Sequence, residues 1–195
     1  MEQIILDSQL PKEEILKQNP NMPAPLDVID NLEIITLIYY GFDSILHQGQ
    51  MVMHKKAVND LKAFFQLAFK IKFPIEKVIP IAYKKYKWND DLSCNDNNSS
   101  GYNFRFIAGT NRMSKHALGL AFDINPAQNP YIRYNEKKEE VFRAPSFALY
   151  DKQNLGTLYK DHPLVVLLKS HGWEWGGDWD IEGGRIDYQH FEFCL

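Results

Sequence analysis

The sequence predicts an α+β fold in which a small antiparallel sheet is flanked by helices. One segment has the apolar spacing of an amphipathic helix, and several short apolar segments between turn residues are typical of strands. The chain has 195 residues, of which 45% are hydrophobic, so it is long enough to form one domain with a sizeable core. No internal repeat is visible.

The first 34 residues are predicted to form an N-terminal arm, and residues 35–195 the domain. Prolines and polar residues punctuate the arm in PKEEILKQNPNMPAP, so we expect it to lie at the periphery. The next segment, LEIITLIYYGFDSILHQGQMVMH, has apolar stretches on both sides of a turn at residues 41–44. This pattern indicates strands or a hairpin that leads into the first helix.

The clearest predicted element is a helix within KKAVNDLKAFFQLAFK, residues 55–70. Its apolar residues recur at steps of three and four and form one stripe, which consists of Ala57, Val58, Leu61, Phe64, Phe65 and Ala68. Phe73 and Pro74 are expected to end this helix. The following KVIPIAY is predicted to be a short strand in which Pro80 occupies an edge or irregular position.

Two polar regions are predicted to be irregular. Residues 87–103 are rich in turn-forming Asn, Asp and Ser and form either a cleft wall or a solvated connector, while residues 127–153 are expected to cross the surface. A second helix is predicted in DHPLVVLLKSHG, with Asp161 as its N-cap, Pro163 in its first turn and Gly172 at its end. The C-terminal WEWGGDWDIEGGRIDYQHFEF has two potential strands around a glycine-rich turn.

Composition argues against several classes of partner. The net charge of −3 and the isoelectric point of about 6.1 provide no basic surface for a nucleic acid. No apolar run approaches the roughly 20 residues of a membrane span, and the N-terminus is too acidic for a signal peptide. Either the protein is not exported by that route or a removed segment precedes this numbering. We expect a monomer.

The two cysteines, Cys94 and Cys194, lack the spacing of a thiolate metal site or a redox motif. A disulfide between them stays open as an alternative.

Two polar residues stand among apolar ones in SKHALGLAFDINP, residues 114–126. If LAFDI is a strand, Asp123 points away from its apolar neighbours, and a bend at Gly119 lets His116 fold back toward it. A carboxylate in such apolar company requires a partner or a metal ion. Imidazole and carboxylate both bind Zn²⁺, but a catalytic zinc usually takes three protein ligands.

His190 in IDYQHFEF is a candidate for the third ligand, because it stands in a predicted strand that can lie beside the first. Asp187 precedes it by three residues and is expected at the entry turn, where it reaches a water without binding the metal. Each residue also has a purely structural explanation: a buried histidine can be a hydrogen-bonded core residue, and Asp123 can cap a turn.

Three motifs occur in a fixed order along the chain. W-G-G-D-W occupies residues 175–179, D-x-x-H occupies residues 187–190, and S-x-H-x-x-G-x-A-x-D precedes both with Ser114, His116, Gly119, Ala121 and Asp123. Over roughly residues 35–193, the chain resembles the D-alanyl-D-alanine carboxypeptidase family of zinc peptidases, in particular the VanY-like group. Its members include D-alanyl-D-alanine carboxypeptidases and L-alanyl-D-glutamate endopeptidases that act on bacterial cell-wall peptides.

The resemblance implies a VanY-like metallopeptidase domain at residues 35–195 with a Hedgehog/DD-peptidase-like fold. It implies that His116, Asp123 and His190 bind Zn²⁺, and that Asp187 is the catalytic acid or base. Some relatives carry glutamate where this chain has Asp187, and an aspartate is shorter.

The same resemblance implies roles for residues around the metal. Arg105 matches the arginine near the scissile carbonyl, with Arg112 as a competing choice, and Ser114 matches a residue that lines the substrate site. Trp175 either packs in the core or forms a cleft wall that contacts substrate. Asp178 is a candidate acceptor for a ring N–H of a ligating histidine.

The expected activity is zinc-dependent hydrolysis of a peptidoglycan stem peptide or muropeptide at the bacterial cell envelope, in the periplasm or the cell wall. Zinc lowers the pKa of its bound water, Asp187 accepts the proton, and Arg105 helps to stabilise the oxyanion. The alternatives are a non-catalytic module of the same fold that binds zinc or cell-wall peptide, and a non-haem iron oxygenase, which also uses two histidines and a carboxylate. The choice between carboxypeptidase and endopeptidase stays open.

Overall fold

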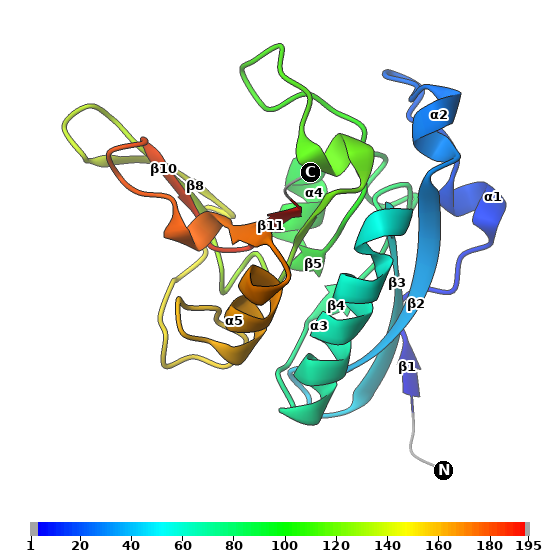
Figure 1. The fold of residues 1–195 in the computed structure, drawn as a ribbon, viewed down its shortest axis with the longest axis horizontal. Helices are drawn as coiled ribbons and strands as arrows, with labels where there is room; N and C mark the ends of the chain where they lie inside the picture. The colour runs from blue at the N-terminus through cyan, green and yellow to red at the C-terminus, as the bar shows by residue number, and fades with distance from the viewer. Residues whose placement is uncertain (1–3, 194–195) are drawn as a thin grey trace.

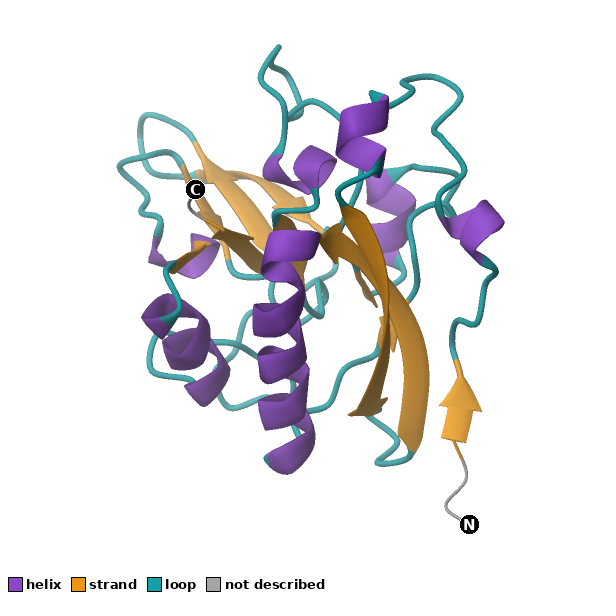
Figure 2. Cartoon of the chain, turned by 45° about the vertical axis from the view of Figure 1, so that its right-hand side comes forward, coloured by secondary structure: helices purple, strands orange, loops and turns teal. Residues whose placement is uncertain are grey.

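The protein is represented by a computed structural model, which describes residues 4–193 and contains small β-sheets surrounded by short helices (Figures 1 and 2). The sheets have the strand orders β1-β3-β2, β4-β5, β6-β11-β9 and β10-β7-β8. This architecture is compatible with the predicted α+β class. In place of one antiparallel sheet, however, the strands form separate sheets, and the pairs β1–β3 and β4–β5 are parallel.

The predicted hairpin and first helix are present. β2 (Leu32–Tyr40) and β3 (Leu46–His54) pair antiparallel along their whole length. A short 3₁₀ turn, η1 (Lys55–Ala57), then leads into α3 (Val58–Lys70), which ends three residues before the expected Phe73. The sequence pattern therefore located both elements, and only the helix end differs.

Helix α3 lies between the β1-β3-β2 sheet and helix α5 (Figure 1). Its predicted apolar stripe is buried. The ring of Phe64 lies 5.4 Å from that of Phe122 in β6 (Ala121–Asp123) and 5.7 Å from that of Phe191 in β11 (His190–Phe193), measured between ring centroids. The helix therefore supports the two strands that carry Asp123 and His190.

The polar regions contain more regular structure than predicted. Residues 87–103 include α4 (Asp90–Asn95) and β5 (Asn98–Ser99), and residues 127–153 include β7 (Tyr131–Tyr134) and β8 (Glu140–Ala144). β7 is the central strand of its sheet, with β10 (Arg185–Asp187) on its other side. The strand predicted in KVIPIAY is limited to β4 (Lys77–Val78).

The second predicted helix is α5 (Pro163–Ser170), with Pro163 at its start as expected. The N-cap is His162 rather than Asp161, because the His162 ring nitrogen accepts from the backbone N–H of Leu164. Gly172 follows the helix with a φ of +85°, which agrees with its predicted terminating role. Strand β9 (Trp173–Trp175) and the 3₁₀ turn η3 (Gly176–Asp178) come next.

The N-terminal segment is more than a peripheral arm. β1 (Ile4–Leu6) extends the first sheet, followed by α1 (Lys12–Ile15) and α2 (Leu26–Ile29). Ile15 is only 1% exposed and packs in a cluster with Leu32 and Val52. Between residues 4 and 193, no helix has the length and apolar character needed to cross a lipid bilayer.

Replacing Phe64 tests whether helix α3 stabilises the strands that carry Asp123 and His190. Phe64→Ala removes a fully buried ring, so it should lower the free energy of unfolding by about 3–5 kcal/mol. Phe69→Ala in the same helix is the matched control. Phe69 is 40% exposed and stacks on Tyr40, so its loss should cost about 1 kcal/mol. Urea denaturation of both variants measures the difference, and equal losses would contradict the assignment of Phe64 to the core.

Candidate active site

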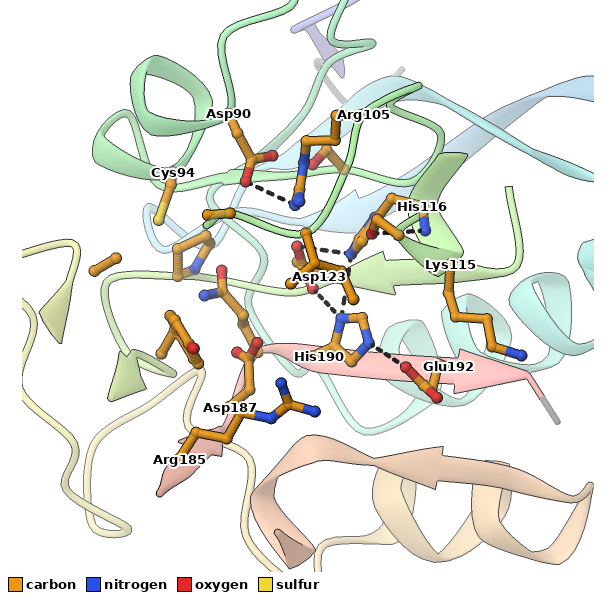
Figure 3. A pocket seen from close by; sticks show the side chains of 18 of the residues that line it. Asp90, Cys94, Arg105, Lys115, His116, Asp123, Arg185, Asp187, His190 and Glu192 are labelled. Carbon is orange, nitrogen blue, oxygen red and sulfur yellow. Dashed lines mark hydrogen bonds and ion pairs between the residues drawn. The ribbon is translucent and has the colours of Figure 1, made fainter. Parts of the chain in front are cut away.

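Three of the predicted site residues converge although they come from distant parts of the chain (Figure 3). His116 lies on a 3₁₀ turn, η2 (Lys115–Leu118), Asp123 ends β6, and His190 begins β11. Nε2 of His116 lies 3.2 Å from Nδ1 of His190 and 3.3 Å from Oδ2 of Asp123. Nδ1 of His190 lies 3.0 Å from Oδ1 of Asp123.

These separations fit a tetrahedral metal ion. Zinc bonds to nitrogen and oxygen of about 2.0–2.1 Å place neighbouring ligand atoms about 3.3 Å apart. The observed separations of 3.0–3.3 Å are close to this value, with the two ring nitrogens next to different oxygens of the Asp123 carboxylate. Three ligands leave a fourth position for water or substrate, as in catalytic rather than structural zinc sites.

The backbone around His116 orients its ring. The Ser114 hydroxyl accepts from the backbone N–H of His116, and Gly119 ends the turn with a φ of +66°. This is the bend expected from the sequence, because a left-handed residue favours glycine. Nδ1 of His116 donates to the carbonyl of Gly101 at 2.7 Å, so Nε2 keeps its lone pair for a metal.

A second acceptor orients His190. Nε2 of His190 donates to Oε2 of Glu192 at 3.1 Å, which directs the other ring nitrogen, Nδ1, at the common point. Sequence reasoning missed Glu192 and assigned this role to Asp178, which instead pairs with Lys169. The available signal was the H-x-E spacing, because residues i and i+2 of a strand share a face.

The electrostatics of the cluster favour a cation. Burial opposes the charged form of His190, but hydrogen bonds to Asp123 and Glu192 outweigh it and raise its pKa to about 10. Burial likewise opposes ionisation of Asp123, but the neighbouring His116 and His190 lower its pKa well below the usual range. A metal ion that displaces the proton on Nδ1 would supply the positive charge that these carboxylates stabilise.

Asp187 lies at the end of β10, and a two-residue turn connects it to His190 in β11. Burial raises its pKa to about 7, with His190 opposing this shift and Asp123 reinforcing it. Oδ1 of Asp187 is buried without a hydrogen-bond partner among residues 4–193 and faces the same cleft as the three candidate ligands. An unsatisfied buried carboxylate oxygen is costly, so its presence here suggests a ligand or a functional role.

The W-G-G-D-W motif positions Asp187. A side chain at Gly176 would come within 2.5 Å of the Asp187 backbone oxygen and 2.9 Å of its Cβ. The first glycine of the motif thus permits the close approach of η3 to β10.

The candidate ligands lie in a cleft of about 540 Å³ that Arg105, Arg112 and Ser114 also line. Nη2 of Arg105 pairs with Oδ2 of Asp90 at 2.8 Å, and its Nε is buried without a partner in the described part of the chain. Arg112 is exposed on the neighbouring loop. The hydroxyl of Ser114 lines the cleft while it caps η2.

Trp175 does not line the cleft. It is 2% exposed, belongs to the main core cluster, and donates its Nε1–H to the carbonyl of Tyr188. Trp179, at the other end of the motif, lines the cleft instead. We therefore replace Trp175 with Trp179 as the candidate substrate contact. Cys94 also lines the cleft, but its pairing with Cys194 lies outside the described residues.

Comparison with known proteins agrees with this geometry. Residues 108–193 match the sequence profile of a family described as D-alanyl-D-alanine carboxypeptidase. No curated protein matches the chain, and no solved structure matches it. The matched segment includes all three candidate metal ligands, Asp187 and the W-G-G-D-W motif. Over residues 108–193, the chain is therefore similar to the D-alanyl-D-alanine carboxypeptidase family of peptidases.

Proposed function

We propose that this protein is a zinc-dependent peptidase that hydrolyses short peptidoglycan peptides, either as a D-Ala-D-Ala carboxypeptidase or as an L-Ala-D-Glu endopeptidase. The family match supports a peptidase that acts on such peptides. The finer assignments, a Hedgehog/DD-peptidase-like domain at residues 35–195 and zinc as the metal, belong to the same proposal.

One observation carries the proposal. The ring nitrogens of His116 and His190 and the carboxylate of Asp123 meet at tetrahedral spacing, and the unpartnered oxygen of Asp187 faces the same cleft. A site that only stored a metal would require no additional carboxylate with an unpartnered oxygen in the cleft. Hydrolysis requires such a group to move a proton.

Bound to His116, Asp123 and His190, a zinc ion would polarise the scissile carbonyl and lower the pKa of a water molecule. Asp187 accepts the proton that this water loses as it attacks the carbonyl carbon. The raised pKa of Asp187 suits it to hold that proton and then donate it to the leaving amine.

Arg105 supports the charge that develops on the carbonyl oxygen. Its guanidinium extends toward the cleft, and its pairing with Asp90 holds it in one orientation (Figure 3). Glu192 and the carbonyl of Gly101 keep the two histidines oriented throughout the reaction.

Incubation of the metal-loaded protein with defined muropeptides tests the proposal, with the products read by mass. Loss of a terminal D-alanine identifies a carboxypeptidase, and release of the stem from its L-alanine identifies an endopeptidase. No product from either substrate, with zinc bound, would favour the non-catalytic binding module. Iron in place of zinc, together with dependence on 2-oxoglutarate, would favour the oxygenase.

Asp187→Asn should reduce kcat/KM by about 10²–10⁴-fold because the amide cannot accept the proton. Bound zinc should be unchanged, since Asp187 is not among the three metal-spaced residues. Asp178→Asn is the matched control, because Asp178 pairs with Lys169 and lies outside the main cleft. Steady-state kinetics and metal analysis of both variants measure these effects. Full turnover by Asp187→Asn would remove the residue from the mechanism.

Glu192→Gln should weaken zinc binding by about 10–100-fold, because it removes the charged acceptor that orients His190. Competition titration against a chelator measures the affinity, and restored activity at saturating zinc would show that the fold is intact. Glu33→Gln, in the exposed face of β2, removes the same charge far from the cleft and should bind zinc normally. Equal affinities of the two variants would rule out a role for Glu192.

A further inference from the structure

The β10-β7-β8 sheet forms one wall of the cleft. Residues paired across its strands share one face, and the members of this face all line the cleft: Tyr131, Arg133, Phe142, Ala144, Arg185 and Asp187. The wall thus presents two arginines and the candidate catalytic aspartate on the same surface.

Arg133 and Arg185 lie directly opposite each other in the antiparallel register of β7 and β10. Like charges in this arrangement repel and destabilise a sheet. Neither arginine forms an ion pair with any residue from 4 to 193, so no protein carboxylate there relieves the repulsion. An anionic ligand placed between the two guanidinium groups would relieve it.

Aromatic rings hold both guanidinium groups in place. The guanidinium carbon of Arg133 lies 4.4 Å from the ring centroid of Phe142, and that of Arg185 lies 4.6 Å from the centroid of Trp179. The Trp179 ring in turn lies 5.5 Å from the ring of His190. Trp179 thus links Arg185 to His190, and Figure 3 shows the Arg185 side chain on the side of the cleft where Asp187 lies.

Other cations of the cleft are less suited to bind an anion. Arg105 is already paired with Asp90, Lys115 donates to the backbone oxygen of Phe193, and Arg112 lies on an exposed loop without a stacking partner among the described residues. The Arg133–Arg185 pair combines charge that no described residue pairs, contact with aromatic rings, and a position on the same sheet face as Asp187.

We propose that Arg133 and Arg185 form a carboxylate-binding subsite for the substrate residue that follows the scissile bond. Arg185 and Asp187 are two residues apart on one strand face, a separation of about 7 Å. Because Asp187 returns its proton to the leaving amine, a carboxylate on the residue that carries this amine lies within reach of the arginines.

The subsite rests on the proposed function. Both candidate substrates carry a carboxylate on the residue that follows the scissile bond. In a D-Ala-D-Ala peptide the residue after the scissile bond carries the terminal carboxylate. In an L-Ala-D-Glu peptide linked through the glutamate side chain, that residue carries a free α-carboxylate. A planar carboxylate also matches the fork geometry of a guanidinium.

The test compares carboxylate and carboxamide forms of the same peptide. One pair of ligands is a D-Ala-D-Ala-terminated peptide and its C-terminal amide, and the other is an L-alanyl-γ-D-glutamyl peptide and its α-amide. Calorimetric titration into zinc-loaded Asp187→Asn protein measures binding without cleavage. The carboxylate form of at least one pair should bind about 10–100-fold more tightly than its amide. The pair that discriminates identifies which carboxylate the subsite takes.

In the same background, Arg133→Gln and Arg185→Gln should each reduce this discrimination by about tenfold or more. Lys137→Gln removes one positive charge from the turn after β7, outside the cleft, and should keep the discrimination. Zinc content and circular dichroism confirm that each variant is folded. Equal binding of acid and amide in both pairs, or discrimination that persists in both arginine variants, would overturn the subsite.

Hydrolysis by the wild-type protein is measured separately with the same peptides. Cleavage without discrimination by the arginines overturns the subsite and leaves the peptidase proposal standing. Arginine-dependent binding without cleavage supports the subsite and overturns the peptidase proposal.

Discussion

The site depends on the antiparallel pairing of β6 and β11, which sets His190 directly opposite Asp123. Paired residues on adjacent antiparallel strands share a face, so this register places one imidazole and one carboxylate side by side although 67 residues separate them in sequence. A one-residue slip of β11 would turn His190 to the opposite face of the sheet, away from Asp123. The third candidate ligand, His116, is then placed by the turn that precedes β6.

The hydrophobic core stabilises this register. Phe122 and Phe191 are the residues next to the two ligands, they are paired across β6 and β11, and their rings stack at 5.4 Å. Both also contact Phe64 of α3. The apolar faces of the two strands therefore bind the helix while the opposite faces present the polar cluster. Alternation along the strands links the stability of the core to the geometry of the site.

Charge is distributed unevenly around the cleft. Asp123 and Glu192 place negative charge at the candidate metal position, whereas Arg133 and Arg185 place positive charge on the neighbouring wall, where no residue between 4 and 193 forms an ion pair with them. A cation at the candidate metal position and an anion between the two arginines would neutralise these charges. Asp187 lies between these two regions, where proton transfer in hydrolysis would be required. The negative candidate metal site and the positive arginine wall would thus fit a substrate that has a carboxylate close to the peptide bond to be cleaved.

The sequence by itself determined the elements with local signals, which are the β2–β3 hairpin and the apolar stripe of α3, and its motifs indicated the candidate ligands His116, Asp123 and His190. These follow from periodicity and motifs, which act over a few residues. Only the tertiary structure decided that Glu192 rather than Asp178 orients His190, and that Trp179 rather than Trp175 lines the cleft. Which of these residues reaches His190 or the cleft depends on the face of the sheet that each strand turns toward the cleft. The pairing of strands that are distant in sequence determines this face, so local sequence does not reveal it.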